Sequence, residues 1–421
     1  MFTTPASYVV LGTFLLALLG WRRGKELLRH DALLLGAILV YFGIGTVDLH
    51  LTPYEWSPRF VIPAAVWTVV AWGSVGYLVG AWVARHRPMG SGRGQEDGED
   101  GEAVRARGRA LRIIGWISLA ILLAVSGAPA VSGTNRERIS AYWTALALLV
   151  VPGTLLTLAT TAIRPRRWGW APPALAVVAW LGTGYRTNAL LLGLSVCVLR
   201  FLELRSPRAR LATVAAALAI VLTLGVGFGY WRTLRHADPD ELRFVRAVAH
   251  RRDPTPIRLG AAYVLASVFR EGPAILGFVV DRHPRFAPYT EGRALWGMLT
   301  SPLPGEQPDA RSIISREVIG SRGTSLVSTI FGPWYLDFGP IGVALVMMLL
   351  AYVLGRVERS ALTVGDPVSR VGYAYGLVLY GLAIHAGLSD FDLVVLIPLA
   401  LLWTAGRLSP PPQAHDSTTA A

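Results

Sequence analysis

Long apolar runs constrain this chain more than any other feature. Of its 421 residues, 53% are hydrophobic and only 16% are charged, and the mean hydropathy is +0.46. Many of the runs are long enough to cross a hydrocarbon core of about 30 Å, which an ordinary soluble domain does not need. The sequence therefore predicts a single all-α membrane domain over residues 1–421, built as a polytopic bundle of spanning helices.

We expect about eleven spans. Their short connections alternate between arginine-rich and arginine-poor, and the positive-inside rule places the rich ones in the cytoplasm. This orientation puts the N-terminus outside the cell and the C-terminus in the cytoplasm. The expected spans are residues 7–21, 32–48, 60–83, 111–128, 140–162, 169–184, 187–203, 211–230, 331–355, 369–387 and 391–406.

Three stretches are expected to lie outside the membrane. Residues 85–109, which include the Gly- and acid-rich sequence MGSGRGQEDGED, are predicted to form a disordered cytoplasmic linker, and residues 408–421 a disordered tail. Residues 231–329 are predicted to form one large external loop that carries short helices. Within it, Ile257–Val280 is apolar but interrupted by charges, so we interpret it as helices on the outer face. A pair of further spans is the alternative.

The charge and the missing motifs narrow the functions that remain. The net charge of +13 is dispersed over many connections, so no nucleic-acid partner is expected. The sequence has no HExxH motif, P-loop, GxSxG motif, Rossmann fingerprint or Cys/His cluster. We therefore expect no cofactor and no metal ion. A secondary transporter is also disfavoured, because no matched pair of Gly/Pro-broken segments marks two halves.

Arg186 is the first candidate site residue. It lies in GYRTNALLLGL (Gly184–Leu194), between two apolar runs that leave almost no room for a loop. A lone cation in a membrane hairpin is costly unless its side chain reaches the interface or an anion meets it. We expect that an anion binds to Arg186.

Arginines of the external segment are the second group of candidates. Arg270 is embedded in apolar sequence, Arg293 lies in PYTEGRALWGMLTSPLPGEQP, and Arg322 lies in ISREVIGSRG. Arginine suits phosphate because its planar fork gives bidentate donors that are always charged. The alternative is that these are solvated charges paired with nearby acids. We expect at least two of them to bind a common anion.

Acid–base residues are also concentrated in the external parts of the chain, but no spacing singles out one of them as a base. Histidines at helix ends are more often structural. The candidates are His250, Asp281, His283, Glu291, Glu306, Asp337 and His385, with Asp390 and Asp392 near the last.

Three motifs together resemble a known family. STIFGPWYLDFGPIGVALVMMLLAYVLG (Ser328–Gly355), EGRALWGMLTSPLPGEQ and GYRTNALLLGL resemble, in this order and spacing, motifs of bacterial O-antigen polymerases, also called oligosaccharide repeat-unit polymerases. The resemblance covers about residues 168–204 and 286–355 and the number of spans. A regular Arg-x10-Gly pattern is missing, which leaves the roles of the loop arginines open.

This resemblance implies a GT-C-like membrane glycosyltransferase that polymerises polyprenyl-pyrophosphate-linked repeat units on the outer face of the cytoplasmic membrane. Donor and acceptor would both be lipid-linked glycans, and membrane lipids, a chain-length regulator and a flippase would be partners. Arginines would stabilise the pyrophosphate leaving group without a metal ion. An acceptor hydroxyl would attack with the help of a base.

Individual roles follow from the same resemblance. Asp337 would hold a turn at the outer end of its span. The other roles are these: Arg186, Arg270, Arg293 and Arg322 for the pyrophosphate, Trp296 and Tyr335 (with Trp334) for stacking on sugars, and Asp281, His283 or Glu291 for the base.

Three other functions remain open. An O-antigen-ligase-like transferase would need nearly the same residues. A lipid-phosphate-sugar transferase would use a carboxylate of the first external loop, where Asp48 and Glu55 lie. A flippase for the same glycan would need charges along a path through the spans. Charges are instead concentrated on one outer face, which favours an enzyme.

Overall fold

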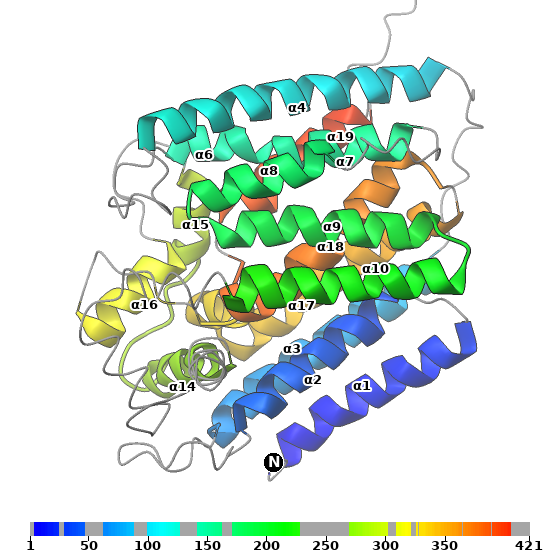
Figure 1. Ribbon diagram of the computed structural model, residues 1–421. Coiled ribbons are helices and arrows are strands. Elements are labelled where there is room, and N and C mark those ends of the chain that lie inside the picture. The colour runs from blue at the N-terminus through cyan, green and yellow to red at the C-terminus, as the bar shows by residue number, and fades with distance from the viewer. Residues whose placement is uncertain are drawn as a thin grey trace, which may run out of the picture.

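The computed structural model describes residues 4–24, 29–46, 62–87, 99–126, 141–161, 171–227, 269–301, 309–320, 326, 328–363, 365–388 and 390–405. Every region in which a span was expected contains helix, and no strand occurs in the described ranges, which confirms the all-α fold (Figure 1). Five helices are long and apolar enough to cross a membrane by length and composition, and shorter apolar helices accompany them.

The helices of the expected spans follow the chain in order. They are α1 (Pro5–Gly24), α2 (His30–Thr46), α3 (Ala64–His86), α4 (Glu99–Ser126), α6 (Ala141–Leu148), α7 (Val150–Thr160), α8 (Ala171–Gly182), α9 (Arg186–Glu203), α10 (Pro207–Ile220) with the π-helix η2 (Val221–Gly227), α17 (Gly332–Thr363), α18 (Pro367–Ala386), and η4 (Asp392–Leu396) with α19 (Ile397–Thr404).

Helix α4 differs from the sequence-based expectation. It begins at Glu99, so residues 99–109, which were assigned to the linker, are helical. The run GEAVRARGRALR continues into the apolar stretch without a proline, and nothing in it ends a helix. Residues 88–98, 228–268 and 406–421 lie outside the described residues. They include part of the expected linker, part of the external loop and the whole expected tail.

Glycines let the central helices α3 and α17 pack closely. A Cβ added at Gly76 would lie 2.2 Å from the carbonyl oxygen of Ala344, and one at Gly80 would lie 2.0 Å from that of Met348. Small residues four apart allow such backbone contact between membrane helices. The two helices run parallel, because Arg359 near the end of α17 donates to the carbonyl of Ala84 near the end of α3 (3.1 Å).

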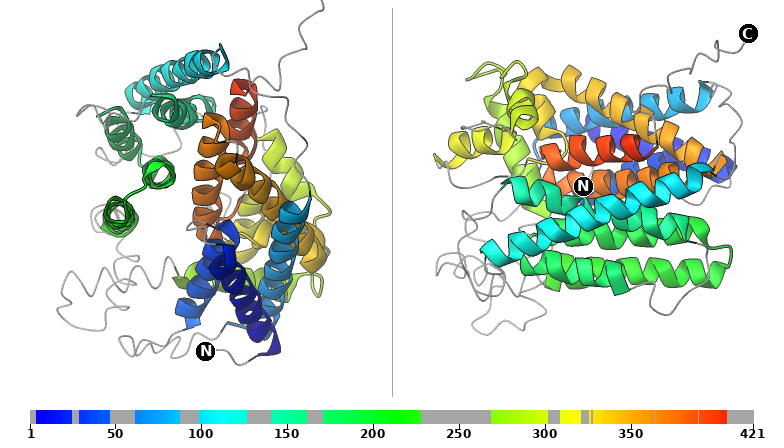
Figure 2. Two further views of the ribbon diagram at one scale, coloured as in Figure 1. Left: turned by 90° about the vertical axis from the view of Figure 1, so that its right-hand side faces the viewer. Right: turned by 90° about the horizontal axis from the view of Figure 1, so that it is seen from above.

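The rest of the bundle is arranged around α18. In Figure 2 the cyan and green helices, α4 to α10, lie on one side, and the blue helices with α17 lie on the other. Helix α18 contacts both groups, through α2 and α17 on one side and α7 and α9 on the other. Helix α10 has no buried residue and packs mainly against α9 and η2.

A buried ionic cluster fastens the end of the bundle where the arginine-rich connections lie. Asp31 pairs with Arg29 and Arg85, each at 2.8 Å, and the backbone N–H of His30 donates to Glu358 (3.2 Å). Buried ions are tolerated only when they are paired and hydrogen-bonded. The cluster therefore ties α2, α3 and α17 together. The sequence analysis did not identify it.

Candidate functional site

Three short helices form a cap at the opposite end of the bundle (Figure 1). They are α14 (Glu271–Arg282), α15 (Arg293–Thr300) and α16 (Ala310–Ile319). Helix α14 packs against α3 and α17, α15 packs against α17, and α16 contacts the other two short helices as well as α17. These helices and the residues that flank them include most of the predicted site residues.

Asp337 of α17 fixes the start of α15. Its buried carboxylate accepts hydrogen bonds from the backbone N–H groups of Ala294 (3.0 Å) and Leu295 (2.8 Å) and from the hydroxyl of Thr290. The first N–H groups of a helix need such acceptors. Asp337 therefore has a structural role, as predicted, and its position at the outer end of the span stays a prediction.

A break in α17 follows Asp337. Gly339 has φ 65°, and Pro340 follows it inside the helix. The ring of Tyr289 packs against Gly339, where a Cβ would lie 2.7 Å from it. Because proline has no backbone N–H, no hydrogen-bond donor is lost at Pro340 itself. It separates the short first part of α17, which carries Tyr335 and Asp337, from the long remainder of the helix.

His283 has the contacts of an anchoring residue. Its Nδ1 lies 2.8 Å from the carbonyl oxygen of Pro288, and its Nε2 lies 3.0 Å from a carboxylate oxygen of Glu317. Both ring nitrogens are therefore engaged by groups of the protein, which is typical of a structural histidine. Tyr335, also buried, donates to the carbonyl of His283 (2.9 Å).

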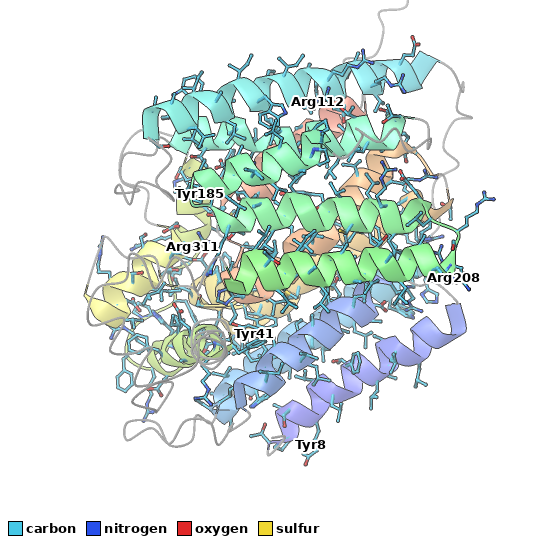
Figure 3. The ribbon with its side chains drawn as sticks, in the orientation of Figure 1. Tyr8, Tyr41, Arg112, Tyr185, Arg208 and Arg311 are labelled. Carbon is cyan, nitrogen blue, oxygen red and sulfur yellow. The ribbon has the colours of Figure 1, made fainter. Side chains whose placement is uncertain are left out.

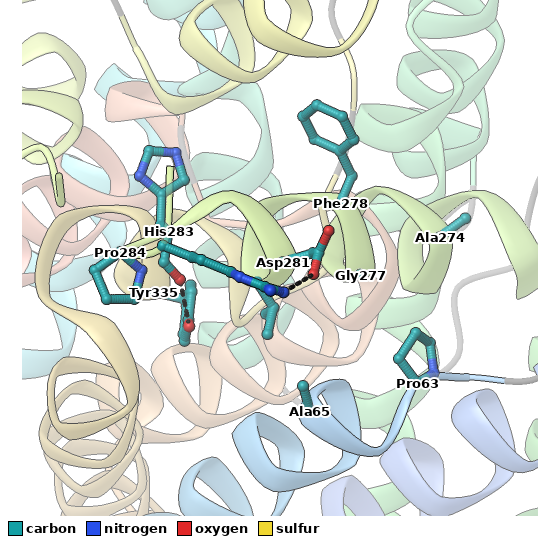
Figure 4. Close-up of a pocket in the computed structure, with 11 residues that line it drawn as sticks. Pro63, Ala65, Ala274, Gly277, Phe278, Asp281, His283, Pro284 and Tyr335 are labelled. Carbon is teal, nitrogen blue, oxygen red and sulfur yellow. Dashed lines mark hydrogen bonds and ion pairs between the residues drawn. The ribbon is translucent and has the colours of Figure 1, made fainter. Parts of the chain in front are cut away.

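A pocket of about 560 Å³ lies beside the C-terminal end of α14 (Figure 4). Its polar residues include Asp281 and Arg285, whose charged groups are 4.0 Å apart and about three quarters exposed. His283 and Tyr335 also line it, so the structure brings three of the predicted site residues together here. The other lining residues are Pro63, Ala65, Ala274, Gly277, Phe278, Val280 and Pro284.

A second polar group forms where α14 begins. The ring of Phe269, next to Arg270, packs against the ring of Tyr41 with centroids 5.7 Å apart. A Cβ at Gly272 would lie 2.5 Å from the Tyr41 hydroxyl, so this part of the chain is held against α2. The same hydroxyl is hydrogen-bonded to Nδ1 of His385 near the end of α18 (3.3 Å). We call Tyr41, His385 and Arg270, which follows Phe269 in the chain, the outer triad, since the sequence predicts that this end of the bundle faces outward.

The two groups are well separated. Arg270 precedes the first residue of α14, and Asp281 is its penultimate residue. At 1.5 Å per residue, the two lie roughly 16 Å apart along the helix. The predicted arginine and the predicted acids at Asp281 and His283 therefore do not share one reacting centre.

Arg186 is the first residue of α9, in a tight turn after α8 that contains Gly184 with φ 80°. It is half-buried, and α9 packs against α18, the helix that carries His385. Figure 3 shows Tyr185, Arg311 and Tyr41 toward the same end of the bundle.

The remaining predicted residues surround α15. Glu291 and Arg293 are exposed, and Trp296 is 66% exposed. Glu291 has φ 52° and donates its N–H to the carbonyl of Asp337 (3.2 Å). Arg322 lies outside the described residues.

One ion pair at this end was not predicted. Arg311 of α16 donates to both oxygens of Asp390 (2.9 and 2.8 Å) and to the carbonyl of Ala386 (3.1 Å). The pair joins residues far apart in sequence, so no local pattern could indicate it. It fixes the turn that directly follows His385.

These features define a class: a helical membrane protein with two groups of polar residues at one end of the bundle. The model of the putative O-antigen polymerase family matches residues 4–255 and 273–397, which is most of the chain. The chain belongs to this family and is a membrane polymerase of the glycosyltransferase type. No curated protein and no solved structure matches it.

Proposed function

We propose that this protein polymerises oligosaccharide repeat units carried on polyprenyl pyrophosphate, at the outer face of the cytoplasmic membrane. The observation that carries the proposal is the outer triad, in which Tyr41 is hydrogen-bonded to His385 and contacts Phe269 and Gly272 on either side of Arg270. The family supports the polymerase activity. The alternation of arginine-rich and arginine-poor connections supports an external position for the site.

In this reaction the arginines stabilise the leaving group. An acceptor hydroxyl oxygen forms a bond to the anomeric carbon of the donor sugar, and the bond from that carbon to the pyrophosphate oxygen breaks. The electron pair leaves with the pyrophosphate, whose negative charge increases. Arg270 and Arg186 each lie at the start of a helix, where the helix dipole adds to the charge of the guanidinium. Preorganised charge of this kind lowers the barrier without a metal ion.

His385 is the base that suits this centre best. Its Nδ1 is hydrogen-bonded to the Tyr41 hydroxyl, and an imidazole in this position would take the proton of the acceptor hydroxyl. The expected bases at Asp281 and His283 lie at the far end of α14, and His283 has both ring nitrogens engaged. Glu291 is held at the start of α15.

The exposed residues of α15 then contact sugars. Trp296 offers a ring face to the glycan, and Arg293 provides donors at the start of the same helix. Membrane lipids surround the spans. A flippase would supply the lipid-linked units, and a chain-length regulator would act on the product.

Replacement of His385 with glutamine tests the proposal. The rate of polymerisation of lipid-linked repeat units by the purified protein in nanodiscs is expected to fall by about 10²–10⁴-fold, because the base is lost. His86→Gln is the matched control, since His86 is exposed and is the last residue of α3. A His385→Gln protein with the thermal stability and the rate of the wild type would refute the role of this histidine.

A further inference from the structure

We propose that the pocket at the C-terminal end of α14 is a second sugar-binding subsite, which holds part of the glycan chain away from the reacting bond. This inference rests on the proposed function, in that the substrates are taken to be glycans. It adds a second place where the protein recognises the glycan. Phe278, Asp281 and Arg285 would determine the specificity there.

Small residues form two sides of the pocket. Pro63 and Ala65 at the start of α3 form one side, and Ala274 and Gly277 of α14 form another. Gly277 is in ordinary contact distance of Pro63, since a Cβ there would lie 3.7 Å from the Pro63 ring. The pocket of about 560 Å³ is within the range of small-molecule sites, about 300–1,000 Å³.

The chemistry of the rim suits a sugar ring. Phe278 and Asp281 are three residues apart on α14, so both side chains lie on one face of the helix, as Figure 4 shows. Phe278 offers an apolar surface against which the C–H groups of a pyranose can pack. Asp281 accepts hydrogen bonds from hydroxyl groups, and the guanidinium of Arg285 donates to them. Because the Asp281–Arg285 pair is long and exposed, its contribution to stability is small and hydroxyl groups can replace it.

The position of the pocket separates it from catalysis. Its charged rim at Asp281 lies roughly 16 Å along α14 from Arg270, a distance that several linked sugar rings can span. A chain held at both places would be oriented along α14, with its reacting end at the outer triad. A charged rim is unnecessary for a prenyl or acyl chain, so Asp281 and Arg285 favour a glycan over a lipid tail.

The test measures binding of a glycan that has neither lipid nor pyrophosphate. The probe is the oligosaccharide released by mild acid from the surface polysaccharide of the cells that make this protein. Its Kd is measured by calorimetry on the full chain in nanodiscs. We expect the wild type to bind the probe and Phe278→Ala to bind it about tenfold more weakly, since an aromatic contact is lost. Asp281→Asn, which preserves the shape, is also expected to bind more weakly.

Phe286→Ala is the matched control. Phe286 is 70% exposed and its ring contacts Arg285 (5.2 Å), but it does not line the pocket. It is expected to bind like the wild type. Equal binding by Phe278→Ala and Asp281→Asn, or no binding by the wild type, would overturn the proposal. So would binding of polyprenyl phosphate, in place of the oligosaccharide, that depends on Phe278.

Arg270→Ala distinguishes this inference from the proposed function. If it loses polymerisation and keeps oligosaccharide binding, both proposals are supported. If it polymerises normally while the binding still depends on Phe278, the catalytic proposal fails and the subsite stands.

Discussion

Replacing Arg270 with alanine should reduce the rate of polymerisation by about 10²–10³-fold, the loss seen when a preorganised donor is removed from a developing negative charge. Arg270 precedes α14, between Phe269 and Gly272, which both contact Tyr41. Its backbone position is therefore fixed by neighbours that the substitution does not touch. The rate is measured with lipid-linked repeat units and the purified protein.

Two further variants are compared with Arg270→Ala. Arg270→Lys should recover only part of the rate, because lysine keeps the charge but loses the planar fork. Arg208→Ala should behave like the wild type, since Arg208 is exposed at the other end of the bundle (Figure 3). A full rate for Arg270→Ala would remove this arginine from the mechanism.

Replacing Gly80 with alanine should destabilise the protein by about 1–3 kcal/mol or more, because a single methyl group would push α3 away from α17. The added Cβ would lie 2.0 Å from the carbonyl oxygen of Met348, and a backbone atom cannot rotate aside as a side chain can. The measurement is thermal unfolding in detergent, monitored by circular dichroism.

Gly381→Ala is the control for this substitution. Gly381 lies inside α18, and a Cβ added there meets nothing within 4 Å. Because alanine is the better helix former, Gly381→Ala should leave the stability unchanged or raise it slightly. Equal thermal stability of both variants would show that α3 and α17 are not packed as closely as described.

The spans could be predicted because their signal is local. A run of apolar residues ended by arginines predicts a helix wherever it lies, and each expected span region contains one. The structural role of Asp337 could be assigned because its sequence YLDFG resembles the turn that the family has at the start of a span.

The grouping of the site residues could not be predicted, because it depends on contacts between distant segments. Tyr41 and His385 are 344 residues apart, and His283 and Glu317 are 34 apart. Arg270 and Asp281 are close in the sequence, but they lie at opposite ends of one short helix. The rise of that helix separates them. Tyr41 of α2 contacts Phe269 and Gly272 on either side of Arg270, and it is hydrogen-bonded to His385 of α18.

The central claim is polymerisation of lipid-linked units at the outer face, and a strain that lacks this protein tests it most directly. Lipid-linked and surface glycans are separated on a gel after restoration of the wild type or of Arg186→Ala. We expect single lipid-linked units accessible from outside in the deletion strain, a full polymer ladder with the wild type, and no ladder with Arg186→Ala. Full-length polymer accumulating on its lipid carrier in the deletion strain would indicate a ligase instead, and units trapped on the cytoplasmic side would indicate a flippase.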